Sequence, residues 1–183
     1  MINLTVARRY AKAALTLGKD DGRYQEYGDE LKGFTALLKR EPELKDALLN
    51  PIYGKDDRHK LLMHLVKTLQ FSPVTGNLLK VMFDKHRLGM VEGVSQVYAE
   101  LMDEMENLSR ARVKAAVTLD EATQDRLRQV LEKLTGTKVV MEVEKDPKIL
   151  GGIVARVGDL VLDGSVRTQL LSLKESLIKG EVL

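Results

Sequence analysis

Residues Met90 to Val117 read MVEGVSQVYAELMDEMENLSRARVKAAV, and the spacing of their apolar residues changes partway along. Up to residue 105 the spacing is helical, through Met90, Val94, Val97, Leu101 and Met105. After Asn107 the period becomes two, with Ala111, Val113, Ala115 and Val117 alternating with Arg110, Arg112, Lys114 and Ala116. Strict alternation is typical of a half-buried strand. We therefore predict one domain over residues 1–106 and a different one over 107–183.

Working back from this stretch, residues 1–106 keep helical spacing almost throughout. One stripe, for example, comprises Tyr27, Leu31, Phe34 and Leu38. Between such stripes stand residues that stop or start helices, namely Gly22, Pro42, Asn50-Pro51, Ser72-Pro73 and Gly89. The first domain is predicted to be an all-α bundle of about six helices.

Working forward, the second domain mixes strands and helices. Asp120 is a suitable cap for a helix, and Val139, Met141 and Val143 mark a second strand. Two short strands are expected at 153–157 and 160–162, and Ser165 can cap a last helix. The turns between these elements are assigned to Gly151-Gly152, Gly158-Asp159 and Asp163-Gly164. The predicted order is βαβββα, a small α+β domain that is marginal in size to fold without a partner.

Composition and motifs argue against several functional classes. The net charge is only +2, with five Tyr, three Phe and no Trp, so neither a phosphate-binding field nor a base-stacking platform for nucleic acid is expected. Cysteine is absent, and no phosphate-binding glycine loop occurs. His59 and His64 are five residues apart, which points them in different directions on a helix. We therefore expect no catalytic residue, metal site or cofactor.

Two predicted helices carry more apolar surface than one core needs. Apolar residues cover about 200° of the first helix, where a stripe of about 100° suffices to pack on a single core. The small residues Ala7, Ala11 and Ala14 suggest one closely packed flank, which leaves Val6, Tyr10, Ala13 and Leu17 as an outward stripe. The helix within 73–88 has a similar arc. Either both helices are central in the bundle, or their surplus faces form a groove for an amphipathic helix.

Two segments resemble a known family. The opening Thr5-Val6-Ala7-Arg8-Arg9-Tyr10-Ala11-Lys12-Ala13-Ala14-Leu15 is similar to the first helix of the delta subunit of F-type ATP synthase, the oligomycin-sensitivity-conferring protein of mitochondria. Arg87-Leu88 fits as well. Residues 150–167, LGGIVARVGDLVLDGSVR, resemble the C-terminal signature of this family. The resemblance covers nearly the whole chain in order, without large insertions.

The resemblance implies a non-catalytic stator subunit of the proton-translocating ATP synthase. In this family the N-terminal domain binds the N-terminal segment of an alpha subunit between helices one and five, and the C-terminal domain holds the end of stalk subunit b. The head is thereby tied to the peripheral stalk and resists the torque of the rotor. For the alpha segment we expect a binding surface made of Val6, Tyr10, Ala13, Leu17, Val74, Leu78 and Val81.

Other assignments stay open at this point. The signature residues Gly151, Gly152, Gly158, Asp163, Gly164 and Ser165 either fix the fold of the second domain or contact the stalk directly, and the first role is preferred. Residues 1–19 contain four basic residues and no acid, as a transit peptide would, but their pattern continues into the bundle. A bacterial chain at the cytoplasmic face of the membrane is therefore expected. The rival functions are a helical adaptor unrelated to ATP synthase and, more remotely, a small enzyme.

Overall fold

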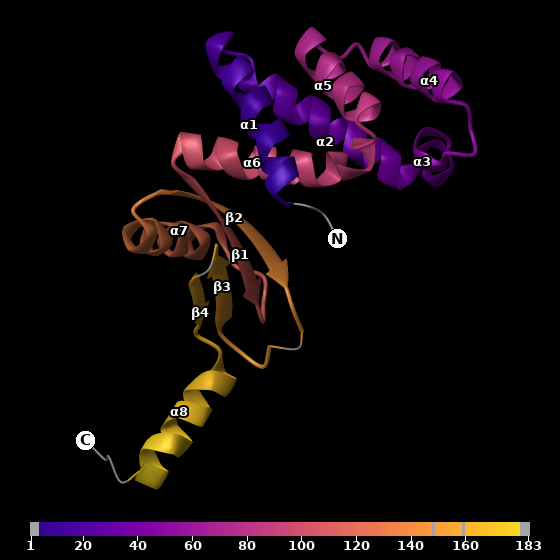
Figure 1. Cartoon of the computed structure of the whole chain (residues 1–183). Coiled ribbons are helices and arrows are strands. Elements are labelled where there is room, and N and C mark those ends of the chain that lie inside the picture. The colour runs from indigo at the N-terminus through magenta and orange to yellow at the C-terminus, as the bar shows by residue number, and fades with distance from the viewer. Residues whose placement is uncertain (1–3, 148, 159, 180–183) are drawn as a thin grey trace. The chain divides into compact units, whose positions relative to one another are not determined.

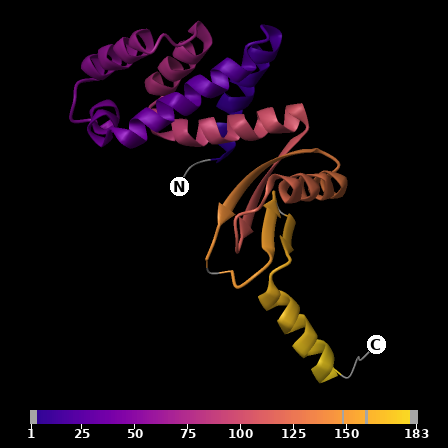
Figure 2. The same ribbon diagram turned by 180° about the vertical axis from the view of Figure 1, so that it is seen from behind.

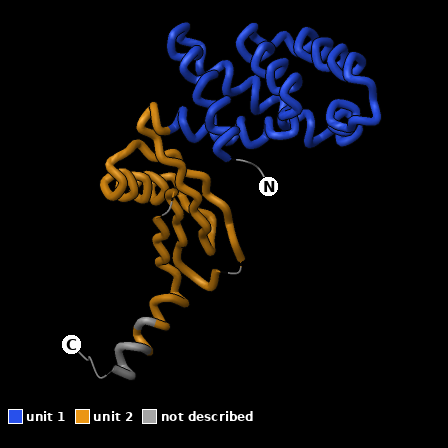
Figure 3. Tube along the Cα trace, viewed as in Figure 1, with its two compact units in different colours: residues 1–103 blue, residues 104–183 orange. Residues whose placement is uncertain are grey.

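The computed structural model describes residues 4–147, 149–158 and 160–179, and divides the chain into two compact units. The first unit comprises Met1–Asp103 and the second Glu104–Leu183 (Figure 3). The division falls within the last turn of the helix that precedes the first strand. The chain is thus mostly helical in its first part and carries a small mixed sheet in its second, which confirms the general layout expected from the change of period.

The first unit is built from helices that begin and end near the predicted interruptions (Figure 1). They are α1 (Leu4–Asp20), α2 (Tyr24–Arg40), α3 (Pro42–Leu49), α4 (Lys55–Thr68), α5 (Pro73–Asp84), the 3-10 turn η1 (Leu88–Met90) and α6 (Val91–Glu106). Proline opens both α3 and α5, where its missing N–H costs no helical hydrogen bond. The α5 helix is also capped by Ser72, whose side chain accepts a bond from the Thr75 N–H.

The core of this unit joins large side chains of α2 and α6 to small ones of α1. Tyr27, Phe34 and Tyr98 are among its largest fully buried side chains, while Ala7 and Ala11 have no exposed surface. At the end of α1 the helix lies against the first residue of α2, where a Cβ on Gly18 would lie 2.8 Å from the Cα of Tyr24. The alanine flank of α1 is therefore its buried side, as predicted.

The second unit contains a four-stranded sheet in the order β2-β1-β3-β4 (Figure 2). Its elements are β1 (Leu108–Ala115), α7 (Glu121–Thr135), β2 (Lys138–Lys145), β3 (Ile153–Val157), β4 (Leu160–Asp163) and α8 (Val166–Lys179). The pair β1 and β2 is parallel and joined through α7, whereas β3 runs antiparallel to both β1 and β4. A parallel pair requires such a crossover, and the helical spacing after Asp120 supplies it.

One face of this sheet carries the core of the second unit. Ala111, Val113 and Ala115 are fully buried there together with Leu131 of α7. The alternation differs from the prediction at Val117, which is 64% exposed. β1 ends at Ala115, where it pairs with Ile153 at the start of β3, and only the Ala116 N–H extends this register, to the Gly152 carbonyl. The strand thus ends two residues before the last apolar residue of the predicted alternation.

Candidate partner-binding surfaces

The proposed groove residues of α1 lie beside the buried alanine flank and are only partly covered. Val6 and Tyr10 are half-buried, Ala13 is exposed, and Leu17 is 51% exposed. Three of them, Val6, Tyr10 and Ala13, line one hollow of about 220 Å³ together with Arg9 and Arg87. The apolar surplus of α1 is therefore not buried by the described part of the chain.

The α5 residues of the predicted groove show the same gradation. Val74 and Leu78 are half-buried and pack against the core, whereas Val81 is 46% exposed. α5 packs directly on both α1 and α2, so the two predicted stripes belong to neighbouring helices. The hollow beside α1 reaches Arg87 in the turn after α5, but the α5 stripe itself does not line it.

The start of α5 is tied to α2 through a carboxylate. Glu30 accepts hydrogen bonds from the backbone N–H and from the hydroxyl of Ser72, both at 2.6 Å. The same hydroxyl accepts the Thr75 N–H at 3.3 Å, and Ser72 is only 4% exposed. A charge-assisted pair of this kind is among the stronger hydrogen bonds in proteins. The direction of α5, and with it the position of its apolar stripe, is therefore held at its first turn.

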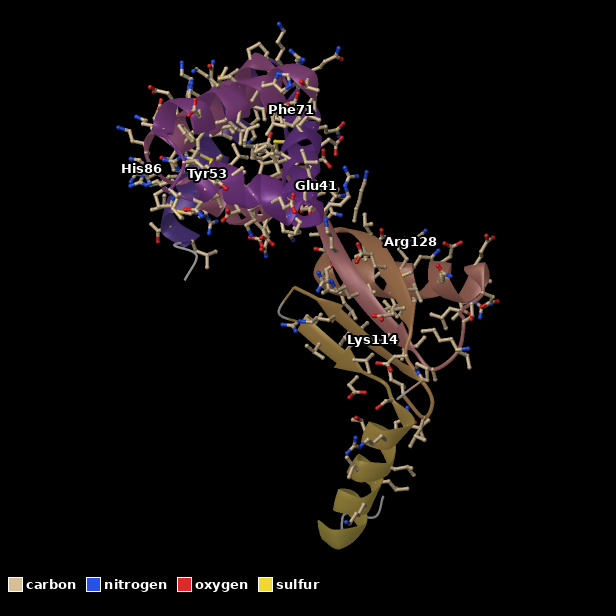
Figure 4. The ribbon with its side chains drawn as sticks, turned by 90° about the vertical axis from the view of Figure 1, so that its right-hand side faces the viewer. Glu41, Tyr53, Phe71, His86, Lys114 and Arg128 are labelled. Atoms are coloured by element: carbon tan, nitrogen blue, oxygen red, sulfur yellow. The ribbon has the colours of Figure 1, made fainter. Side chains whose placement is uncertain are left out.

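The end of α5 is tied to α1 by a residue that the helical spacing did not single out. Arg87 donates from Nη1 to the Tyr10 hydroxyl at 3.2 Å, and its guanidinium carbon lies 6.0 Å from the centroid of the Tyr10 ring. The two residues are 77 positions apart, so no local pattern could have paired them. In the same turn, His86 is exposed at the surface of the first unit (Figure 4).

The signature of the second unit forms one closely packed junction between β3, β4 and α8. Gly152 has φ +84°, and a Cβ on it would lie 2.3 Å from the carbonyl oxygen of Gly164. Gly151 accepts a bond from the Val166 N–H at 2.9 Å, and a Cβ on Gly151 would meet the Val166 side chain at 2.8 Å. Only residues without a side chain allow this approach of the two segments.

Asp163 and Ser165 organise the first turn of α8. Asp163 accepts the Ser165 N–H and the Thr168 hydroxyl, both at 2.9 Å, and the nearly buried Ser165 hydroxyl accepts the Thr168 N–H at 3.3 Å. These bonds, led by the one from the Ser165 backbone, hold the pKa of Asp163 below its ordinary value. Gly158 follows β3 with φ +56°, while its predicted turn partner Asp159 lies outside the described residues.

Beyond this junction, α8 presents apolar side chains without cover. Val166, Leu170 and Leu173 recur at helical spacing and are 40%, 59% and 57% exposed. On α7, Val130 and Leu134 are both more than half exposed, whereas Leu131 beside them is buried. Exposed apolar side chains that gather in this way on a small unit are typical of a partner-binding surface.

The described residues contain no group of three or more His, Asp or Glu side chains placed to hold a metal ion. His59 instead lies beside the ring of Phe83, with 5.7 Å between the ring centroids, and His64 is exposed. Among the helices of the described part, none has both the length and the apolar character needed to cross a membrane.

Comparison with known proteins gives matches over essentially the whole chain. The sequence model of the family described as ATP synthase delta (OSCP) subunit matches residues 6–177. The chain is 46% identical over 183 residues to "ATP synthase subunit delta" of Desulfatibacillum aliphaticivorans, covering 100% of both chains. It is 45% identical over 175 residues to the subunit of the same name from Desulfotalea psychrophila, covering 96% of each.

The fold has a counterpart among solved structures. A chain of the Toxoplasma gondii mitochondrial ATP synthase hexamer, determined by cryo-EM, aligns with a TM-score of 0.69 at 22% identity, over 94% of this chain and 97% of that one. At this identity the likeness concerns the fold, and the family rests on the sequence matches. These matches confirm the resemblance noted in the two terminal segments: the chain belongs to the ATP synthase delta (OSCP) subunit family.

Proposed function

We propose that this chain is a non-catalytic stator subunit of a proton-translocating F-type ATP synthase, which links the catalytic head to the peripheral stalk. The observation that carries this proposal is the family match along residues 6–177, together with relatives of the same length that bear the name ATP synthase subunit delta. The protein is a structural part of the synthase and catalyses no step itself. Its contribution is mechanical, since it keeps the head from turning with the rotor.

The first unit is proposed to act as a six-helix bundle that binds the N-terminal helix of an alpha subunit. Its contact surface would comprise the α1 stripe Val6, Tyr10, Ala13 and Leu17 and the α5 stripe Val74, Leu78 and Val81. Partial exposure of these apolar residues supports this assignment. Covering the exposed halves of Leu17 and Val81 alone would contribute roughly 1 kcal/mol each.

The second unit, from about residue 107 onward, is proposed to hold the end of stalk subunit b. The uncovered apolar side chains of α8 support this role, because a stalk helix could bury them. In this proposal Gly151, Gly152, Gly158, Asp163, Gly164 and Ser165 act mainly on the fold, by fixing where α8 begins. The assembled complex would place the chain peripherally at the cytoplasmic face of a bacterial membrane.

Calorimetry on the full chain tests the alpha contact. The ligand is a peptide of about 20 residues from the N-terminus of the alpha subunit of the same organism. Saturable 1:1 binding with a negative heat-capacity change is expected, because apolar surface is removed from water. Ala13→Asp should weaken binding, because it places a charged side chain under the apolar face of the peptide, beside Arg9 and Arg87. Ala36→Asp, on an exposed position of α2, is the matched control and should bind normally.

The result that contradicts the alpha assignment is equally concrete. A folded chain that does not bind the peptide, or an Ala13→Asp variant with unchanged affinity, would show that this surface does not receive the alpha segment. For the stalk contact, Leu170→Asp should reduce co-purification of subunit b while Gln169→Asp, one position away, should not. Equal retention of b by both variants would remove α8 from that interface.

A further inference from the structure

The turn after α5 holds Arg87 in a defined place. His86 takes a left-handed conformation with φ +55°, and the Arg87 N–H bonds to the Met82 carbonyl at 2.7 Å. This is the arrangement that ends many helices, with one residue at positive φ and a bond spanning five positions. From this fixed backbone the Arg87 side chain reaches the Tyr10 hydroxyl on α1. The guanidinium is therefore positioned before any partner binds.

The same guanidinium retains most of its hydrogen-bonding capacity. It has five N–H donors, and the structure assigns one contact of Nη1 to Tyr10. No carboxylate of the described residues forms an ion pair with Arg87 or with Arg9, the other cation of this hollow. The remaining lining residues are Val6, Tyr10 and Ala13, none of them acidic. The hollow thus combines an apolar floor with two cations that lack an anionic partner within the described chain.

The apolar floor and the two arginines together determine what kind of molecule fits the hollow. Bare phosphate would satisfy the two arginines but would leave the apolar floor without a contact. A helix that presents an apolar stripe with a carboxylate at its edge satisfies both features at once. The planar guanidinium fork of Arg87 matches a carboxylate in two-point geometry, which a lysine could not provide.

We propose that Arg87, positioned by Tyr10 and assisted by Arg9, receives a carboxylate from the partner helix, and that this contact sets the register and specificity of binding. The inference rests on the proposed function of the α1 and α5 stripes as the alpha-binding surface, and it specifies the partner. The alpha segment should carry an Asp or Glu beside its apolar stripe, at the level of the hollow. Tyr10 then acts both as an apolar contact and as a positioning residue for Arg87.

The test is a double-mutant cycle on the full chain, with the alpha N-terminal peptide as the probe. Arg87→Gln should weaken binding by about 5- to 20-fold, as expected for a hydrogen-bonded charge pair that is partly removed from water. Arg87→Lys should recover only part of this loss. Replacing one acidic residue of the peptide by its amide should weaken binding to the wild-type chain by a similar factor and have little further effect on Arg87→Gln.

Controls separate this proposal from the one on which it rests. Lys32→Gln removes an exposed charge from α2, outside the hollow, and should leave the affinity unchanged. Circular dichroism verifies that each variant is folded. Binding of Arg87→Gln with wild-type affinity, or additive losses for every acidic position of the peptide, would overturn the carboxylate contact while leaving alpha binding intact. If the wild-type chain does not bind the peptide at all, both proposals fail together.

Discussion

Gly152→Ala is the substitution for which the structure makes the sharpest quantitative statement, and Gly136→Ala is its matched control. Both glycines belong to the second unit and have positive φ, +84° and +70°. They differ in what an added methyl group would meet. At Gly152 it would lie 2.3 Å from the carbonyl oxygen of Gly164, whereas at Gly136 nothing lies within 4 Å. The pair therefore separates backbone strain from steric overlap.

The expected magnitudes follow from these two contributions. A left-handed conformation costs a non-glycine residue about 1–2 kcal/mol, and the stiffer unfolded chain offsets about 0.4–1 kcal/mol of this. Gly136→Ala should therefore destabilise the second unit by about 1 kcal/mol. At Gly152 the overlap with a backbone atom forces β3 and the start of α8 apart, which adds about 1–3 kcal/mol. The total for Gly152→Ala is then about 2–4 kcal/mol.

The distribution of aromatic residues permits a clean assay. All five Tyr and three Phe lie before residue 104, so near-ultraviolet signals report on the first unit alone. Hydrogen exchange of the β1 and β2 amides reports on the second unit. Exchange there should be roughly 5- to 150-fold faster in Gly152→Ala than in Gly136→Ala, with the aromatic signals of both unchanged. Equal exchange rates in the two variants would refute the close approach of residues 152 and 164.

Three further predictions concern individual contacts. Glu30→Ala leaves the buried N–H and hydroxyl of Ser72 without their acceptor, so it should lower the free energy of unfolding of the first unit by about 1–3 kcal/mol. Urea unfolding followed by tyrosine fluorescence measures this change, and an unchanged midpoint would contradict the contact. Gly18→Ala should destabilise the same unit, because its methyl group meets a backbone atom of α2. Gly33→Ala has open space around it and should stabilise the unit by roughly 0.5–1 kcal/mol. A more stable Gly18→Ala variant than Gly33→Ala variant would contradict the packing. Because the pKa of Asp163 is lowered, its stabilisation of the start of α8 is complete above the ordinary carboxyl pKa and is lost as the pH falls through the depressed value. Protection of the amides in the first turn of α8 from hydrogen exchange should fall in the same pH range. Asp163→Asn should abolish this pH dependence.

Much of the fold could be predicted because its signals are local. Proline and serine at the start of α5 and glycines at positive φ act through their own backbones. The change from helical to alternating spacing near Asn107 reflects which side chains face a core, and it can be recognised without knowing which segments form the rest of that core. Prediction was weaker where an element ends, as at Val117, since the end of β1 depends on where its pairing partner β3 begins.

The binding surfaces could be predicted only in part from local patterns. Angle counting on α1 separated the buried alanine flank from the stripe containing Leu17, because helix geometry determines which residues share a face. It did not find Arg87, which depends on a turn that brings residues 77 positions apart into contact.

The helical first part, the strand-and-helix second part and the family can all be recognised from consecutive residues, because periodicity, capping and the two terminal segments are local features of the chain. Three features emerge only when the elements pack: which apolar side chains stay exposed, how Glu30 holds the start of α5, and how Tyr10 positions Arg87. Exposure and hydrogen bonding between distant segments depend on which elements become neighbours. Local spacing specifies each element but not its neighbours.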